Sequence, residues 1–226
     1  PKLLSKQGLD AVSSLATRTA IEMRDLGFNI NLGVMVNTHS FYSYTSDVDR
    51  AARIGETITK RYAVNHVFTG YEYFPGGADY TVPGMKLDVS KETLMDDDGR
   101  VFAQLIGATA DEHPMIMVNA VKVTSIDANQ PVSLSKPIIT DWLRKELGFE
   151  GVVITDDIEV GAAVAGMSIE DYAVHTINAG SDMVIVCNHA KHIKDVHDAL
   201  TQAVENGTIS EARLDESVRR IMLMKF

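Results

Sequence analysis

Two adjacent carboxylates, Asp156 and Asp157, are the residues of this sequence best placed to perform chemistry. They end the segment GFEGVVITDD (148–157), whose short apolar run is bounded by glycine on one side and by polar residues on the other. That pattern predicts a buried strand. Parallel α/β proteins place their reacting groups at the carboxyl ends of such strands, and burying a carboxylate there without a task would be costly. We therefore expect Asp156 or Asp157 to act on a ligand.

Other polar residues follow predicted strands and are secondary candidates for the same site. Glu72 could serve as an acid, because a carboxyl group at a barrel mouth can have its pKa raised, although a solvated or ion-paired glutamate is the more ordinary role. Asn119 could hydrogen-bond a ligand, or it could cap a loop. His39 and His189 are candidate proton carriers, since each follows a strand.

Metal and nucleotide sites have no support in the sequence patterns. His189, His192 and His197 are spaced by three and five residues rather than by the four of a helical zinc pair, so we predict no metal. The acidic run at 96–98 is typical of a solvated helix start rather than of a calcium loop. Neither a P-loop nor a G-x-G-x-x-G motif is present, and we expect no cofactor.

The composition excludes several classes of partner. The 226 residues carry a formal net charge of −10, which argues against binding nucleic acid or an anionic membrane surface. No apolar run approaches the ~20 residues of a membrane span. The single cysteine, Cys187, rules out an intramolecular disulfide and suits a reducing compartment, so we expect a cytoplasmic protein in which Cys187 is a buried, inert thiol.

Strand-like and helix-like patterns alternate along the chain, which predicts an α/β fold with a parallel sheet in a single domain. Five strands leave two choices, an open doubly wound sheet or a (β/α)8 barrel, for which eight strands are needed. Strands are expected over 29–36, 66–74, 114–120, 152–156 and 182–187, and helices over 7–26, 47–62, around 101–106, 135–148, 168–180, 192–206 and 210–224.

Residues 131–164 resemble the family 3 glycoside hydrolases, and most closely their bacterial β-N-acetylhexosaminidase branch. The matching elements are Ser133-Leu134-Ser135, the segment Leu143 to Gly151, and Thr155-Asp156-Asp157, in the same order and spacing. The resemblance implies a TIM-type (β/α) barrel, of which residues 1–226 would form a partial domain with about five of the eight βα units. It also implies hydrolysis of β-linked amino sugars with retention, without metal or cofactor.

The resemblance assigns roles to several residues. Asp156 would be the nucleophile, with an acid partner roughly 5 Å away, and Asp157 would hold the loop or tune Asp156. The family's Asp-Ser-His triplet, whose His is the general acid, aligns with Asp88-Val89-Ser90, so Ser90 replaces that His. Asp88, Ser90 and Glu72 are then the candidates for proton transfer. The candidate sugar contacts are Glu72, Asn119, Asp157, His39 and His189.

Two further expectations follow from these departures. Because most of the family's polar sugar-binding groups are replaced, the protein could be a degenerate relative that binds a sugar or a protein without hydrolysing it, or a barrel enzyme with different chemistry built on Asp156. Because the family has about three more βα units upstream of residue 7, an N-terminal segment or a second copy is expected to complete the barrel.

Overall fold

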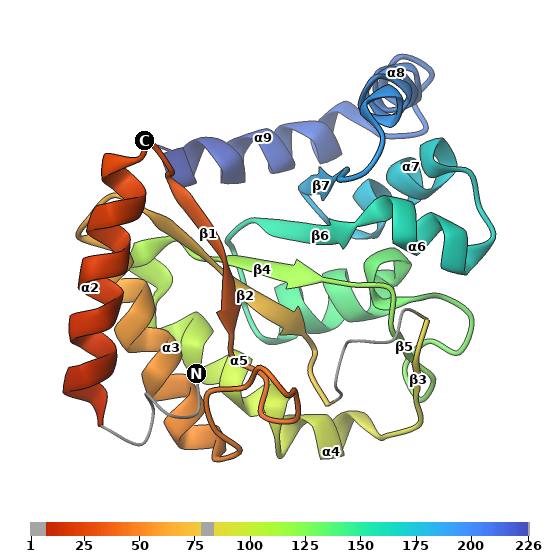
Figure 1. The fold of residues 1–226 in the computed structure, drawn as a ribbon. Coiled ribbons are helices and arrows are strands. Elements are labelled where there is room, and N and C mark those ends of the chain that lie inside the picture. The colour runs from red at the N-terminus through yellow and green to blue at the C-terminus, as the bar shows by residue number, and fades with distance from the viewer. Residues whose placement is uncertain (1–7, 78–83, 226) are drawn as a thin grey trace. The chain divides into compact units, whose positions relative to one another are not determined.

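The computed structural model describes residues 8–77 and 84–225, and it alternates helices with parallel strands as the sequence predicts (Figure 1). The chain divides into two compact units. The first consists of Pro1–Asp79 and Ser90–Met117, and the second of Tyr80–Val89 and Val118–Phe226. The fold class is α/β.

In the first unit, strands β1 and β2 pair in parallel and β4 follows next to β2. Helix α3 packs against α2 and α5, so three helices lie together beside this part of the sheet. The elements are α2 (Leu9–Asp25), β1 (Ile30–Met35), α3 (Val48–Ala63), β2 (Phe68–Phe74), α4 (Lys91–Met95), α5 (Asp98–Ala108), the short helix η1 (Ala110–Glu112) and most of β4 (Met115–Val118).

Helix α3 shows how the sequence specifies this unit. Asp47 caps it, because the Asp47 carboxylate accepts a hydrogen bond of 2.8 Å from the backbone N–H of Arg50. The apolar stripe of Ile54, Ile58 and Tyr62 then faces inward and is buried. This burial, rather than the intrinsic propensity of the helix, is what stabilises α3 in place.

In the second unit, β6 and β7 pair in parallel, and two short strands, β3 and β5, form a separate parallel pair. The π-helix η3 begins with a proline in its first turn, where no backbone N–H is needed. The elements are β3 (Lys86–Leu87), β5 (Lys122–Val123), η2 (Val132–Leu134), η3 (Pro137–Glu146), β6 (Val153–Asp157), α6 (Ile158–Ala165), α7 (Ile169–Ala179), β7 (Met183–Ile185), α8 (Ala190–Glu205) and α9 (Glu211–Lys225).

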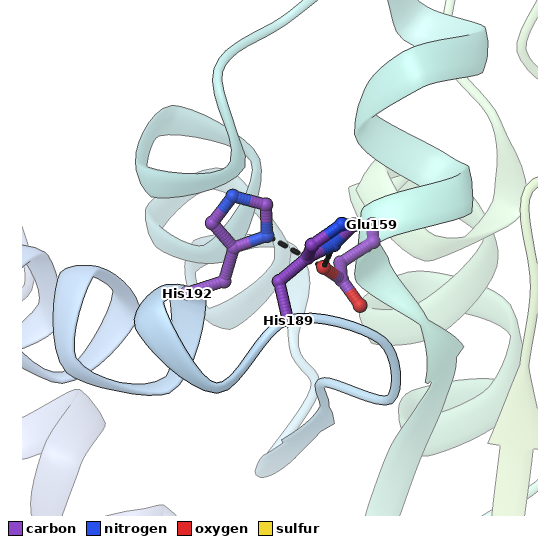
Figure 2. A group of neighbouring side chains, drawn as sticks. All are labelled: Glu159, His189 and His192. Carbon is purple, nitrogen blue, oxygen red and sulfur yellow. Dashed lines mark hydrogen bonds and ion pairs between the residues drawn. The ribbon is translucent and has the colours of Figure 1, made fainter.

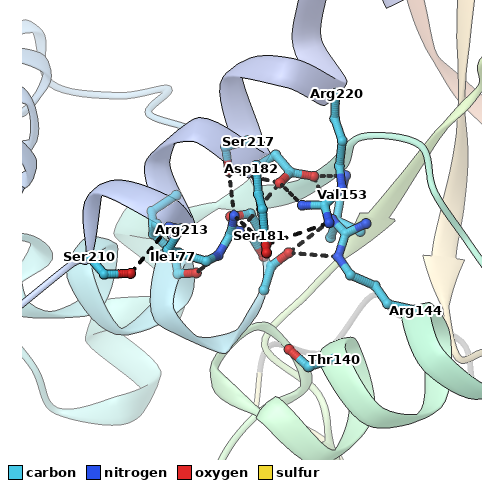
Figure 3. Close-up of polar contacts among 12 residues, drawn as sticks. Thr140, Arg144, Val153, Ile177, Ser181, Asp182, Ser210, Arg213, Ser217 and Arg220 are labelled. Atoms are coloured by element: carbon cyan, nitrogen blue, oxygen red, sulfur yellow. Dashed lines mark hydrogen bonds and ion pairs between the residues drawn. The ribbon is translucent and has the colours of Figure 1, made fainter. Parts of the chain in front are cut away.

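A buried carboxylate connects these elements. The side chain of Asp182, just before β7, is fully buried and accepts hydrogen bonds from Arg144 of η3 (2.5 Å) and Arg220 of α9 (3.0 Å) (Figure 3). Ser217 donates to it at 2.8 Å, and the backbone N–H of Val153 at 3.0 Å. Asp182 therefore ties η3, β6 and α9 to the start of β7.

Arg144 also explains a motif that the sequence singled out. Its guanidinium donates to the carbonyl oxygens of Phe149 (3.3 Å) and Gly151 (3.1 Å), so the turn between η3 and β6 folds back onto the helix end. Burial lowers the pKa of Arg144 to about 10, against the opposing effect of Asp182, so the group stays charged near neutral pH.

Most predicted elements are confirmed within a few residues, and Ile138, Ile139 and Trp142 lie in the core as expected of a buried helical stripe. Two expectations are wrong. Asp98, expected in a solvated helix start, is fully buried, and Cys187, expected in the core, is exposed because β7 ends at Ile185. Within residues 8–77 and 84–225, no helix is long and apolar enough to span a lipid bilayer.

Candidate active site

The end of strand β6 presents Asp156 through an irregularity in its pairing with β7. The register shifts between Ile154 and Asp157, so Thr155 and Asp156 lie within the irregular stretch. The Thr155 hydroxyl accepts a hydrogen bond of 3.2 Å from the backbone N–H of Ile185, satisfying a donor of β7. Such irregularities re-aim side chains at the ends of strands. Here the apolar residues of β6 stay buried while Asp156 becomes exposed.

Asp156 has few partners. Its Oδ1 accepts one hydrogen bond, 2.8 Å from the backbone N–H of Asp157. The pKa of Asp156 is raised above its ordinary value, mainly because surrounding protein displaces water from the carboxylate; the Asp157 N–H opposes this rise, and the Asp157 charge adds to it. Asp156 is thus an exposed carboxylate from which the surrounding protein displaces part of the water.

Asp157 has a different role from its neighbour. It caps helix α6, because its Oδ1 accepts from the backbone N–H of Glu159 at 3.0 Å. Its Oδ2 accepts from the side-chain amide of Asn188 at 2.7 Å. Both oxygens are engaged in holding the loop, as expected if Asp157 supports Asp156 rather than reacting itself.

A small pocket opens beside Asp156. It has a volume of about 40 Å³, room for two or three water molecules, and is too small to enclose a sugar. A sugar could therefore enter it only in part. The polar residues that line it include Asn119, Ser133, Asp156, Asp157 and Tyr172.

Ser133 and Tyr172 line this pocket side by side. The hydroxyl groups of Tyr172 and Ser133 share a hydrogen bond of 2.5 Å, and both side chains are buried. Burial raises the pKa of Tyr172 to about 12, and the charge of Asp156 adds to the rise, so the phenol stays protonated. The Tyr172 ring packs against Gly161 so tightly that a Cβ at Gly161 would lie 2.4 Å from the hydroxyl oxygen.

Asn119 belongs to this pocket but turns its side chain toward its own loop. The side-chain Oδ1 of Asn119 accepts from the backbone N–H of Val121 at 3.2 Å, and its backbone carbonyl oxygen accepts from the N–H of Ser133 at 3.0 Å. The structure therefore places Asn119 beside Asp156 and also gives it the loop-capping role.

His189 is joined to Asp157 through Glu159 and Asn188, and Figure 2 shows the part of this network that Glu159, His189 and His192 form. His189 and His192 each place Nδ1 against Glu159 Oε1, at 2.6 and 2.5 Å, and the other carboxylate oxygen accepts from the backbone N–H of Asn188 at 2.5 Å. Burial of Glu159 raises its pKa, but these three hydrogen bonds outweigh it and lower the pKa to about 2. Asn188 thus bridges Glu159 and Asp157.

Asp88 and Ser90, two of the candidates for proton transfer, each accept a hydrogen bond from a neighbouring group. Ser90 caps helix α4, accepting from the backbone N–H of Thr93 at 3.1 Å. Asp88 is exposed and accepts from the hydroxyl of Thr124 at 3.3 Å. The family resemblance places Asp88 and Ser90 in one motif, whereas in the structure the two residues belong to different compact units.

Glu72 and His39 lie in the first unit, near the carboxyl ends of β2 and β1. The backbone carbonyl of Glu72 accepts from Val36 N–H at 3.2 Å, and its side chain is half-buried. His39 pairs through Nε2 with Asp97, and this hydrogen bond raises the pKa of His39 above its ordinary value.

Three carboxylates were missed because sequence spacing cannot reveal them. Asp98 accepts from the backbone N–H groups of Thr38 (2.7 Å) and Gly77 (2.6 Å), Asp182 binds three arginines, and Glu159 binds two histidines. For Glu159 one weak signal existed, since it lies three residues after Asp156 in the first turn of α6. The partners of all three lie about 20 to 60 residues away along the chain.

Parallel strands alternating with helices, with an exposed carboxylate at the end of one of them, define an α/β protein of the class that carries its reacting groups at the carboxyl ends of its strands. Residues 2–224 match the glycosyl hydrolase family 3 N terminal domain, and the chain belongs to that family.

Individual relatives agree with this assignment. The chain is 24% identical to beta-hexosaminidase A of Pseudoalteromonas piscicida, over 97% of its own length and 41% of that protein, and 31% identical to a beta-hexosaminidase of Haemophilus influenzae, over 79% and 52%. It superimposes on the beta-N-acetylglucosaminidase of Thermotoga maritima with a TM-score of 0.88 at 24% identity, covering 99% of this chain and 50% of that one. The likeness confirms the TIM-type barrel fold, to which residues 8–77 and 84–225 contribute a parallel sheet of five strands. The chain spans about half the length of these relatives.

Proposed function

We propose that this chain carries the nucleophile of a retaining glycoside hydrolase that acts on terminal β-linked N-acetyl amino sugars, with Asp156 attacking the anomeric carbon. The observation that carries the proposal is the state of Asp156, which is exposed at the end of β6, poorly solvated and bound by a single backbone N–H. Membership of family 3 and the beta-hexosaminidase relatives supply the substrate class.

The supporting groups fit this chemistry. Asp157 and Asn188 hold the loop that bears Asp156, so the nucleophile keeps one orientation while its second oxygen faces the ligand. The small pocket lined by Ser133 and Tyr172 would take one substituent of the sugar, and the ring would lie over its opening.

The acid partner is the open part of the proposal. Asp88, Ser90 and Glu72 are the nominated groups, with His39 and His189 as candidate proton carriers or sugar contacts. A serine is a poor proton donor, and Ser90 is already engaged as the cap of α4. This specific observation favours a second candidate function, in which a degenerate family member binds the sugar without hydrolysing it.

A pair of substrates separates these functions. The leaving group of an activated aryl glycoside departs without protonation. An alkyl glycoside requires a general acid, whose loss lowers the rate by about 10²–10⁴-fold. If the chain has the nucleophile and lacks the acid, we expect hydrolysis of a dinitrophenyl N-acetyl-β-glucosaminide and none of the methyl glycoside. Hydrolysis of both identifies a functional acid, and hydrolysis of neither, with saturable sugar binding by calorimetry, identifies the binding module.

Asp156→Asn tests the nucleophile directly. We expect it to lower kcat on the activated glycoside by about 10⁴-fold or more, a size typical of removing a member of a catalytic unit, with little change in melting temperature. Asp141→Asn is the matched control, because Asp141 is an exposed aspartate paired with Lys145 on η3. Equal rates for Asp156→Asn and the wild type would remove Asp156 from the mechanism.

The same proposal covers the setting of the chain. We infer that residues 1–226 form a partial barrel domain that further polypeptide or a second copy completes. We also infer that the protein acts in a bacterial cytoplasm, since its single cysteine suits a reducing compartment and the beta-hexosaminidase relatives are bacterial. Light scattering on the purified protein measures whether a second copy is present.

A further inference from the structure

Glu159, His189 and His192 form a cluster of ligand-type side chains (Figure 2), of which the proposed hydrolysis names only His189, as a candidate proton carrier or sugar contact. One oxygen or nitrogen atom from each lies within 4.8 Å of those of the others. The three residues come from the first turn of α6 and from the start of α8, which the fold brings together across about 30 residues of sequence. The spacing of the histidines along the sequence predicts no metal site, because it takes no account of the carboxylate of Glu159.

We propose that Glu159, His189 and His192 bind a divalent transition-metal ion of the zinc class, with a water molecule as the fourth ligand. Two imidazole nitrogens and one carboxylate oxygen are a donor set that zinc accepts in three-ligand sites, whereas calcium and magnesium prefer oxygen ligands alone.

The geometry requires only a small adjustment. With zinc–ligand bonds of about 2.0–2.2 Å in a tetrahedron, neighbouring ligand atoms are roughly 3.3 Å apart. The two Nδ1 atoms now lie 2.6 and 2.5 Å from Glu159 Oε1 as hydrogen-bonding partners, so each must retreat by less than about 1 Å when the ion replaces the shared protons. Both rings can turn, because the His189 side chain is 69% exposed and that of His192 is 32% exposed.

The carboxylate is already oriented for this role. Glu159 is only 9% exposed at its side chain, and the Asn188 backbone N–H holds its second oxygen at 2.5 Å. An outer hydrogen bond of this kind fixes a ligating carboxylate and strengthens metal binding. The rings of His189 and His192 are 4.9 Å apart at a tilt of 54°, so both nitrogens reach the same oxygen without stacking on each other.

The other group of this kind, His39 with Asp97 and Asp98, is less suitable. Asp98 is fully buried and its oxygens already accept from Thr38 and Gly77. A metal there would have to displace these backbone donors, whereas the cluster around Glu159 would give up only two side-chain protons.

The test is a calorimetric titration of the protein with zinc chloride, with cobalt(II) as a spectroscopic substitute. We expect one ion per chain and the visible absorption of tetrahedral cobalt. His189→Gln combined with His192→Gln should weaken binding by at least about tenfold, the smallest loss seen even for outer-shell changes. His197→Gln, on the exposed side of α8, should bind as the wild type does.

Glu159→Gln is the second variant, because it keeps the shape of the side chain and removes its charge. Circular dichroism establishes that each variant is folded. The proposal is overturned if the wild type binds no zinc at one ion per chain, or if the double histidine variant or Glu159→Gln binds it as tightly as His197→Gln does. None of these readouts depends on glycoside hydrolysis, so failure of one proposal leaves the other standing.

Discussion

Asp156 and Asp182 lie in the same unit, the first near the end of β6 and the second just before β7. Their surroundings are opposite. Asp182 precedes β7, has a fully buried side chain and accepts hydrogen bonds from three arginines, Ser217 and a backbone N–H. Asp156 lies near the end of β6, is exposed and accepts one backbone N–H.

This is the difference expected between a structural carboxylate and the nucleophile that we propose at Asp156. Burying Asp182 is tolerable only because cations and donors surround it, and these partners leave it no lone pair with which to react. Asp156 lacks such partners and keeps an oxygen available, at the cost of a raised pKa. The number of donors to each carboxylate, rather than its burial alone, therefore indicates its role.

The comparison is tested most severely at Asp182. Asp182→Asn removes the negative charge while Arg144, Arg213 and Arg220 remain, with side chains only 10–15% exposed. We expect a loss of about 3–5 kcal/mol in the free energy of unfolding, as is typical when one partner of a buried ion pair is removed. Urea denaturation measures it.

Asp156→Asn is the counterpart of that variant and should change the free energy of unfolding by no more than about 0.5 kcal/mol, as exposed sites do. If the two aspartates cost the same in denaturation, the distinction between the structural and the reactive carboxylate is wrong.

Gly161, which lines the pocket with Tyr172, is the site of an intermediate expected effect on the free energy of unfolding. Gly161→Ala places a methyl group 2.4 Å from the Tyr172 hydroxyl, and Tyr172 cannot withdraw easily because it is buried and bonded to Ser133. We expect a loss of about 1–3 kcal/mol in the free energy of unfolding, typical of overpacking. Thermal and urea unfolding measure it.

Gly107→Ala is the control for helix propensity. Gly107 lies in α5 with no atom within 4 Å of an added Cβ, so its replacement should be neutral or stabilise by up to about 1 kcal/mol. A destabilisation by Gly107→Ala as large as that by Gly161→Ala would mean that the contact with Tyr172 is not what Gly161 protects.

These contrasts also show what the sequence could reveal. Asp156 and Asp157 were identified because strand and carboxylates are adjacent in the chain, and α3 and η3 because caps and apolar stripes are local patterns. Asp98 is the clearest failure, because its buried role depends on Thr38, 60 residues away. The acidic run around it has the composition of a solvated helix start, so only the tertiary fold distinguishes the two.

The smallest effect concerns pH, at Asp156 and at its exposed counterpart Asp141. Burial raises the pKa of Asp156, so its protonated form is favoured in the folded state. Its contribution to stability is therefore complete below the unfolded pKa and is lost as pH rises through the folded pKa. The hydrogen bond from Lys145 lowers the pKa of Asp141, so its contribution is present above the unfolded pKa and is lost as pH falls through the folded pKa.

Denaturation of the wild type, Asp156→Asn and Asp141→Asn between about pH 3 and about pH 7 measures both slopes. As pH rises, the wild type should lose stability relative to Asp156→Asn and should gain stability relative to Asp141→Asn. A slope of zero at Asp156 would show that water reaches this carboxylate freely, and a slope of the same sign as that at Asp141 would show that partners of the charged form lower its pKa. Either result would contradict the displacement of water on which the proposed nucleophile rests.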